Sequence, residues 1–270
     1  MSNFWTRTFA GIVFLIVLIG SIVWSEYSFF VLFFFLSTMG TIEFYNVAQK
    51  SSFSPQKWMG VTISVLLFSV TYCIIKGYLD SFYLFVFFPL ILLVFIAELF
   101  RKTEHPIQNI AYTVLGVFYV SVPFALLHLM VFDSITLNYN FHFILGAFII
   151  IWSNDTGAYL TGLKFGRTKL FERISPKKTW EGSIGGFVFA MVAAFFISRN
   201  FIDITFYNWL VLAFIIVFTG SLGDLVESML KRSVNIKDSG NIIPGHGGIL
   251  DRFDSFLFSV PFVVAYLMLI

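Results

Sequence analysis

Apolar runs of about twenty residues, the length of helix that crosses a ~30 Å hydrocarbon core, recur along almost the whole chain. Of the 270 residues, 58% are hydrophobic and only 12% are charged, whereas soluble domains carry about 25% charged residues. The alternating pattern of a transmembrane β-barrel is absent. The sequence therefore predicts an all-α, polytopic membrane protein with about nine transmembrane helices.

The runs define the approximate bounds of the expected spans, which are Phe4–Trp24, Phe29–Val47, Trp58–Ile75, Phe82–Phe100, Ile107–Phe132, Phe141–Leu163, Ile184–Phe201, Phe206–Leu230 and Phe253–Ile270. We expect one integral membrane unit. Residues 1–135 would form its first five helices, and residues 136–270 would form the remaining four and contain the polar motifs described below. We find no linker or soluble domain between the spans.

The basic residues orient the chain. If the N-terminus is cytoplasmic, all but two of the 17 lysines and arginines fall in segments on the cytoplasmic side, and only Lys76 and Arg199 fall outside. Such a bias is what the positive-inside rule requires. We therefore expect a multi-pass protein of the cytoplasmic (inner) membrane, with a polar cavity that opens to the cytoplasm.

The stretch Ser228–Asp254 is the most polar part of the sequence. It combines cations suited to phosphates, carboxylates suited to Mg²⁺ and glycines suited to close backbone approach, namely Lys231, Arg232, Lys237 and Arg252; Asp238, Asp251 and Asp254; and Gly245, Gly247 and Gly248 beside His246. Together they indicate phosphoryl chemistry on a metal-bound polyphosphate. A merely solvated loop would explain the charges, but not the glycines directly before Asp251.

A second polar region begins inside the sixth span. Asp155 and Tyr159 interrupt the apolar pattern there, and an aspartate within a membrane helix costs at least ~2.5–3.5 kcal/mol. A compact block, Ser175–Gly182, follows in the next loop, where Pro176 interrupts regular structure. A helix-packing cluster and a basic run attracted to anionic lipid are the alternative interpretations.

Both regions resemble the phosphatidate cytidylyltransferases, also called CDP-diacylglycerol synthases. The family's final signature is matched by Ser228, Lys231, Arg232, Lys237, Asp238, Gly240, Pro244, His246, Gly247, Gly248, Asp251, Arg252 and Asp254. Its two earlier blocks are matched by Asp155, Thr156, Ala158 and Tyr159, and by Ser175, Pro176, Lys177, Lys178, Thr179, Glu181 and Gly182. The resemblance implies that CTP and phosphatidate are converted to CDP-diacylglycerol and pyrophosphate, and it implies a homodimer.

These observations assign a role to each candidate residue. The predicted catalytic residues are Asp224, Asp251, Lys177, Lys178, Lys231, Arg232, Lys237 and Arg252. The predicted substrate-binding residues are Asp155, Tyr159, Ser175, Thr179, Glu181, Ser228, Asp238, Gly245, His246, Gly247, Gly248 and Asp254. Asp224 and Asp251 are the first choice as Mg²⁺ ligands, Asp254 and Asp155 are the second, and a second cation is possible.

Two other functions fit part of the pattern. A polyprenol kinase would also use CTP at a membrane, and a cation transporter would use Asp155 and Asp224 as an ion site. No P-loop sequence is present, and we expect no nucleic-acid partner. Elsewhere, we expect Glu43 and Glu98 to be solvated at the membrane interface, and we expect Gly182 and Gly186 to pack helices within or between subunits.

Overall fold

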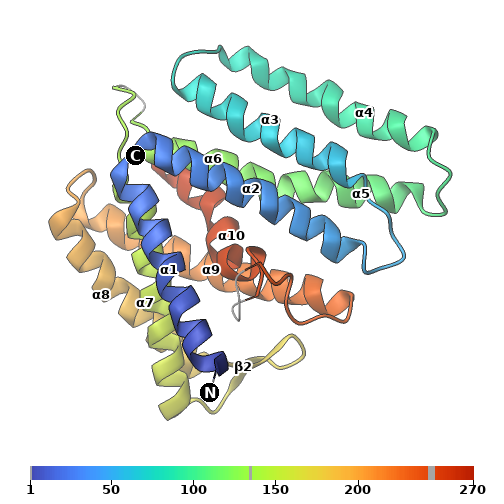
Figure 1. Ribbon diagram of the computed structural model, residues 1–270. Coiled ribbons are helices and arrows are strands. Elements are labelled where there is room, and N and C mark those ends of the chain that lie inside the picture. Colours follow the sequence, from blue (N-terminus) through green and yellow to red (C-terminus); the bar gives the residue numbers. More distant parts are fainter. Residues whose placement is uncertain (1, 134–135, 243–246) are drawn as a thin grey trace. The chain divides into compact units, whose positions relative to one another are not determined.

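The computed structural model describes residues 2–133, 136–242 and 247–270. Its helical elements, in chain order, are α1 (Ser2–Trp24), α2 (Glu26–Ala48), α3 (Lys57–Ile75), the 3-10 helix η1 (Ser81–Val86), α4 (Phe87–Leu99), α5 (Pro106–Gly116), the π-helical turn η2 (Val117–Ser121), α6 (Val122–Val131), α7 (His142–Phe165), α8 (Trp180–Asn200), α9 (Phe206–Ser233) and α10 (Leu250–Leu267). A hairpin of β1 (Lys169–Phe171) and β2 (Ser175–Thr179) precedes α8 (Figure 1). A helical segment is present for every predicted span.

Within the described residues, seven helical segments are long and apolar enough to cross a membrane. The prediction of an all-α polytopic membrane protein is therefore confirmed. The count of about nine is not, because two of the expected spans do not meet this criterion. The apolar part of α1 covers only Thr8–Trp24, and the first turns of α10 contain Asp251, Arg252 and Asp254.

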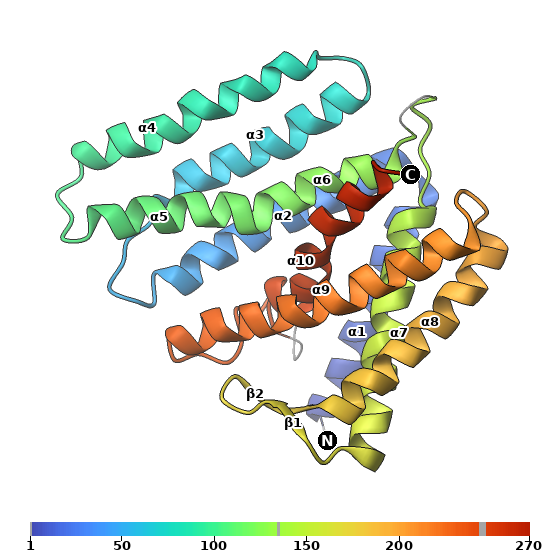
Figure 2. The same ribbon diagram turned by 180° about the vertical axis from the view of Figure 1, so that it is seen from behind.

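The chain divides into two compact units. Unit 1 comprises residues 1–139 and 233–253, and unit 2 comprises residues 140–232 and 254–270. In unit 1, α3 lies beside α2, α4 and the α5–η2–α6 segment, as both views show (Figures 1 and 2). The loop before α10 thus belongs to the same unit as the N-terminal helices.

Buried hydroxyl groups link the helices of unit 1. Thr41 on α2 lies 3.0 Å from the hydroxyl of Ser64 on α3 and 3.3 Å from that of Ser121 in η2. One turn further along α2, the Tyr45 hydroxyl donates to the Thr113 carbonyl oxygen at 2.7 Å. Such bonds between helices satisfy polar groups that would otherwise be buried without a partner.

Close packing of α7 against α8 defines unit 2. Two glycines on α8 face the backbone of α7. A Cβ at Gly186 would lie 2.6 Å from the Asn154 carbonyl oxygen, and a Cβ at Gly182 would lie 3.0 Å from the Ala158 carbonyl oxygen. Gly182 and Gly186 therefore pack helices within the subunit. Small residues allow this close approach in the absence of a strong hydrophobic driving force between helices.

The segment between α7 and α8 was expected to be a loop, and the structure corrects this expectation. β1 and β2 pair in antiparallel fashion, with Lys169 opposite Thr179. The Thr179 side chain then caps α8 by accepting a hydrogen bond from the Gly182 N–H at 3.1 Å. The hairpin is thus fixed to the start of the helix that follows it.

The expectation that Glu43 and Glu98 are solvated at the interface is wrong. Each has only 3% of its surface exposed. The Glu98 carboxylate accepts hydrogen bonds from Gln56, Thr103 and Asn109 and pairs with Arg101 at 2.8 Å. Donors from several segments therefore replace the water that a carboxylate at the membrane surface would otherwise bind.

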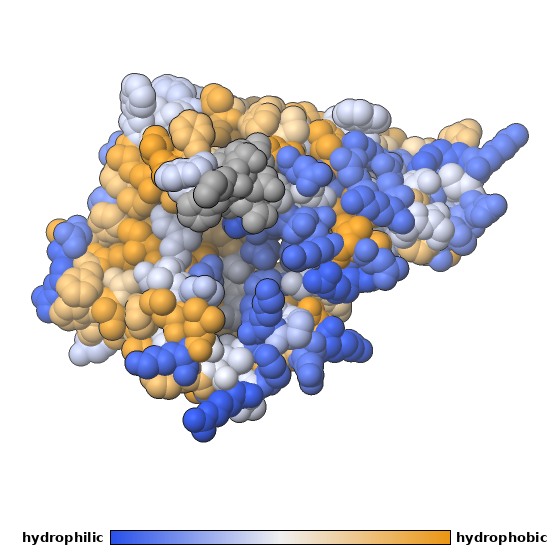
Figure 3. All heavy atoms as spheres, turned by 60° about the horizontal axis from the view of Figure 1, so that its bottom comes forward, coloured by the Kyte–Doolittle hydropathy of each residue, from blue (hydrophilic) through white to orange (hydrophobic). Residues whose placement is uncertain are grey.

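Large apolar side chains cover much of the outer surface of the helices. Trp24, Leu99 and Phe100, for example, are more than 80% exposed. Figure 3 also shows hydrophilic side chains gathered over part of one face. Exposed apolar side chains on this scale are incompatible with a soluble monomer and fit a protein whose helices contact lipid.

Candidate active site

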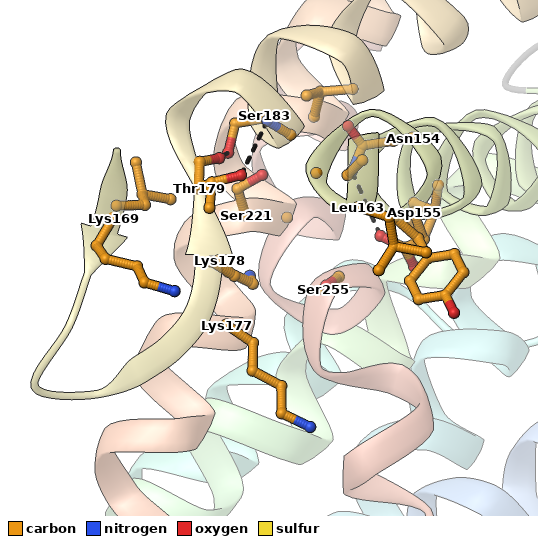
Figure 4. Close-up of a pocket in the computed structure, with 18 of the residues that line it drawn as sticks. Asn154, Asp155, Leu163, Lys169, Lys177, Lys178, Thr179, Ser183, Ser221 and Ser255 are labelled. Atoms are coloured by element: carbon orange, nitrogen blue, oxygen red, sulfur yellow. Dashed lines mark hydrogen bonds between the residues drawn. The ribbon is translucent and has the colours of Figure 1, made fainter. Parts of the chain in front are cut away.

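Unit 2 contains a cavity of about 660 Å³, within the ~300–1,000 Å³ typical of ligand sites. Its polar lining comes from α7, the hairpin, α8, α9 and α10, and consists of Asn154, Asp155, Tyr159, Lys169, Lys177, Lys178, Thr179, Ser183, Ser221 and Ser255. Figure 4 shows the three lysines on the hairpin side of the cavity and Asn154 and Asp155 on α7. Five of the predicted site residues, from both sequence blocks, therefore line one cavity.

Lys178 is the cation in closest contact with a carboxylate at this site. Its Nζ lies 2.6 Å from Oδ2 of Asp224 on α9, and both side chains are partly buried. The other oxygen of Asp224, Oδ1, accepts a hydrogen bond from the Ser228 hydroxyl at 3.2 Å, one helical turn later. The hairpin and α9 are thus joined by an ion pair that also orients the Asp224 carboxylate.

Two further carboxylates interact with this ion pair. Asp155 interacts electrostatically with Lys178 and Asp224, and Asp254 interacts with both of them as well as with Lys231. Aspartates that share one lysine repel one another, and a divalent cation would relieve that repulsion. The chemistry of this donor set therefore fits a hard cation such as Mg²⁺.

No group of three or more His, Cys, Asp or Glu side chains in the described part of the chain is arranged to bind a metal ion. Mg²⁺ usually keeps several waters and uses only one or two protein carboxylates together with substrate phosphates. A metal at this site would accordingly share ligands with a bound polyphosphate.

Glu181 and Ser175 support the hairpin. The Glu181 carboxylate, in the first turn of α8, accepts backbone hydrogen bonds from Arg167 and Thr168 at 3.1 Å. Ser175 begins β2 and pairs with Phe171. These contacts give both residues a structural function, and their predicted contact with substrate stays a prediction.

The remaining predicted residues lie outside the cavity lining. In unit 2, Lys231 forms an ion pair with Glu227 one turn earlier on α9, and Arg232 is exposed. In unit 1, Lys237, Asp238 and Arg252 are exposed. Asp251 lies in the first turn of α10, and Gly247 and Gly248 lie just before that helix. Gly245 and His246 lie outside the described residues. The two first-choice metal ligands, Asp224 and Asp251, belong to different units, and their shared role stays a prediction.

Several cavity residues were not assigned from the sequence. Lys169, Asn154 and Ser221 line the cavity, but they were given no role from the sequence. Ser183 and Ser255 directly follow the matched blocks at Gly182 and Asp254. Lysine and serine are common near membrane surfaces, so residue type alone could not single them out.

The helices and the lysine-lined cavity define a multi-pass membrane protein with a site suited to a phosphorylated ligand. Residues 5–270 match the Cytidylyltransferase family. Because this match covers nearly the whole chain, the protein belongs to that family.

Individual relatives agree with this assignment. The chain is 41% identical over 162 residues to a phosphatidate cytidylyltransferase of Staphylococcus saprophyticus, covering 59% of this chain and 60% of the relative. It is 43% identical over 162 residues to one of Staphylococcus aureus (strain COL), with the same coverage. It is 44% identical over 171 residues to one of Bacillus subtilis (strain 168), covering 62% of each protein. The matched part thus spans less than two thirds of each of these relatives.

Proposed function

We propose that the protein is a phosphatidate cytidylyltransferase, which converts CTP and phosphatidate to CDP-diacylglycerol and pyrophosphate. The main support is the cavity of unit 2, where Lys169, Lys177 and Lys178 lie with Asp155 in a membrane protein of the Cytidylyltransferase family. The three relatives described above bear this enzyme's name. None of the three is a kinase or a transporter.

The proposed reaction requires two anions to meet. A phosphate monoester has its second pKa near ~6, so phosphatidate is mostly a dianion at neutral pH and needs no strong general base. Its phosphate oxygen attacks the α-phosphorus of CTP, and the bond between that phosphorus and the bridging oxygen breaks as pyrophosphate leaves. Lys177 and Lys178 would reduce the repulsion between the phosphates and stabilise the charge that develops on the leaving group.

A divalent cation fits this scheme. Mg²⁺ would be held by Asp224 and Asp251, with Asp254 and Asp155 as second choices, and the CTP phosphates would complete its shell. When bound, it would supply neutralisation of the negative charge on the CTP phosphates. Lys178, which pairs with Asp224 at 2.6 Å, would then be able to exchange that carboxylate for a phosphate oxygen. A second cation remains part of the proposal.

Substrate access and assembly are part of the same proposal. The asymmetric distribution of lysine and arginine supports a cytoplasmic location for the hairpin, where CTP is present. Phosphatidate would enter sideways from the inner leaflet of the cytoplasmic membrane. The family resemblance supports a homodimer, whereas the glycine pair on α8 is used within the subunit.

The decisive test is to incubate the purified protein with phosphatidate, Mg²⁺ and CTP labelled at either the α- or the γ-phosphate. We expect α-label in a lipid that co-migrates with CDP-diacylglycerol, and γ-label only in pyrophosphate. Transfer of γ-label to a lipid acceptor would instead indicate a CTP-dependent kinase. Ion flux into vesicles without CTP, with no labelled lipid formed, would indicate a transporter.

A further inference from the structure

Glu43 is a buried carboxylate on α2 that contacts a segment about two hundred residues later in the chain. Its Oε2 accepts a hydrogen bond from the Ile249 N–H at 2.8 Å, and its Oε1 accepts one from the Ser239 hydroxyl, a residue 196 positions away in sequence. Ser239 is itself buried, with 4% of its surface exposed. Glu43 therefore contacts both ends of the segment from residue 239 to residue 249, which we call the motif loop. The structure describes residues 239–242 and 247–249 of this segment.

Two glycines of the motif loop make room for the Glu43 side chain. A Cβ at Gly240 would lie 2.9 Å from the Glu43 carboxyl carbon, and a Cβ at Gly248 would overlap the carboxylate itself. In the sequence, Gly248 suggested a backbone that a ligand approaches closely, and Gly240 was only a match to the family signature. The structure gives Gly240 and Gly248 a different function, because the group that approaches them is a side chain of the same protein.

The same loop ends are also held by Asp251. Oδ2 of this residue accepts hydrogen bonds from the Ser239 N–H at 2.9 Å and from the Gly248 N–H at 2.8 Å. Ser239 thus donates its N–H to Asp251 and its O–H to Glu43. Gly247, the residue before Gly248, takes a φ of +90°, and a Cβ at this position would lie 2.6 Å from Asp251 Oδ2.

We propose that Glu43 is a positioning residue, which holds the ends of the motif loop together and thereby sets the orientation of the Asp251 carboxylate. The inference about catalysis rests on the proposed function, in which Asp251 binds Mg²⁺. The role of Glu43 in holding the ends of the loop does not rest on the proposed function, because it follows from the hydrogen bonds that Ser239 and Ile249 donate to Glu43. A carboxylate buried to this degree requires such donors, since burial without them is costly.

Glu98 provides a matched control in the same unit. It is buried to the same extent as Glu43, but its hydrogen-bond partners are Gln56, Thr103, Asn109 and Arg101. None of these partners belongs to the motif loop. Replacing Glu98 with Gln should therefore disturb a buried carboxylate of unit 1 without affecting the loop ends.

The first experiment measures access to the loop. A reporter cysteine replaces Ile249, whose side chain is buried with 1% of its surface exposed and whose backbone N–H still donates to Glu43. The background is Cys73→Ser, and the reaction of the reporter with a maleimide is followed in the purified full-length protein. We expect Glu43→Gln to accelerate labelling about tenfold, the loss expected for one hydrogen bond to a charged group. Ser239→Ala removes one of the same hydrogen bonds and should also accelerate labelling, so it serves as the test variant if Glu43→Gln folds poorly. Glu98→Gln should leave the rate unchanged. Equal labelling in all three variants would overturn the proposal.

The second experiment tests the effect on Asp251 through turnover. We expect Glu43→Gln to raise the Mg²⁺ concentration needed for half-maximal activity and to lower kcat about tenfold, with the KM for phosphatidate unchanged. A loop that opens while kcat and the Mg²⁺ dependence stay at wild-type values would refute the positioning role. If the wild-type protein makes no CDP-diacylglycerol, the proposed function fails, whereas the labelling result still decides the role of Glu43 in the loop.

Discussion

Neighbouring lysines on β2 differ in what they contact. Lys178 pairs with Asp224, whereas Lys177 lines the cavity and is exposed. We expect Lys177→Gln and Lys178→Gln each to lower kcat/KM for CTP about tenfold, because each removes a charge-assisted contact to phosphate. Lys164→Gln is the control, since Lys164 is an exposed lysine near the end of α7 that does not line the cavity.

Steady-state kinetics with purified protein, together with thermal unfolding, will separate catalysis from folding. Both cavity variants should unfold near the temperature of the parent protein. If all three lysine variants keep parental kinetics, the basic block would serve only to attract anionic lipid.

The predicted metal ligands lead to a second test at the level of single residues. Asp224→Asn and Asp251→Asn keep the side-chain shape but weaken metal binding, so each should abolish nearly all turnover. The double variant should lose little more than either single one, because residues that act as a unit are not additive. The measurement is CDP-diacylglycerol formation against Mg²⁺ concentration. Parental activity and Mg²⁺ dependence in either single variant would reassign the site to Asp155 or Asp254.

The sequence predicted site residues best where charge lies in an otherwise apolar run. Asp155 was singled out for that reason, whereas Lys177 and Lys178 were singled out by the compact block Ser175–Gly182 and its family resemblance. All three line the cavity. Glu43 was misinterpreted because a lone carboxylate near the end of an apolar run is equally expected of a solvated interface residue. Its partner Ser239 is 196 residues away, and no local pattern connects the two positions.

At the level of the elements, glycines on α8 determine how closely it packs on α7. We expect Gly186→Ala to destabilise the protein by about 1–3 kcal/mol, because the new methyl group would lie 2.6 Å from the Asn154 carbonyl oxygen, which belongs to the α7 backbone. Gly20→Ala on α1 is the control, since a Cβ there meets no atom within 4 Å. Thermal unfolding in detergent measures both variants. Equal melting temperatures would show that α8 can move away from α7 at no cost.

The helices were predictable because length and apolar composition suffice to identify them. Each expected span coincides with a helical segment, and the ends differ by a few residues. The hairpin was not predictable. Its strands are only three and five residues long, and Ser175–Thr179 contains two lysines and a proline instead of the alternating apolar residues typical of a strand. Its last residue, Thr179, accepts a hydrogen bond from the Gly182 N–H, and Glu181 accepts one from the Arg167 N–H, so both ends of the hairpin are held by backbone bonds.

For the whole molecule, the distribution of charge sets the expected orientation in the membrane. Lysines and arginines fall almost entirely in alternate connecting segments, and Lys76, one of the two exceptions, pairs with Glu26 at 2.8 Å. The Glu26 carboxylate raises the pKa of Lys76 by a hydrogen bond. An ion pair reduces the net charge that this segment presents, so it opposes the orientation less than a lone lysine would.

The orientation is tested with single cysteines in a Cys73→Ser background. Ser175→Cys and Asn241→Cys report on the hairpin and the motif loop, and Asp80→Cys reports on the segment between α3 and η1, where the side chain is exposed. Asn241 is preferred to Ser239, which is buried. With an impermeant thiol reagent added to intact cells, we expect Asp80→Cys to react and the other two to react only after the membrane is permeabilised. Labelling of Ser175→Cys in intact cells would place the lysine-lined cavity on the side without CTP, and both the topology and the proposed access of nucleotide would then be wrong.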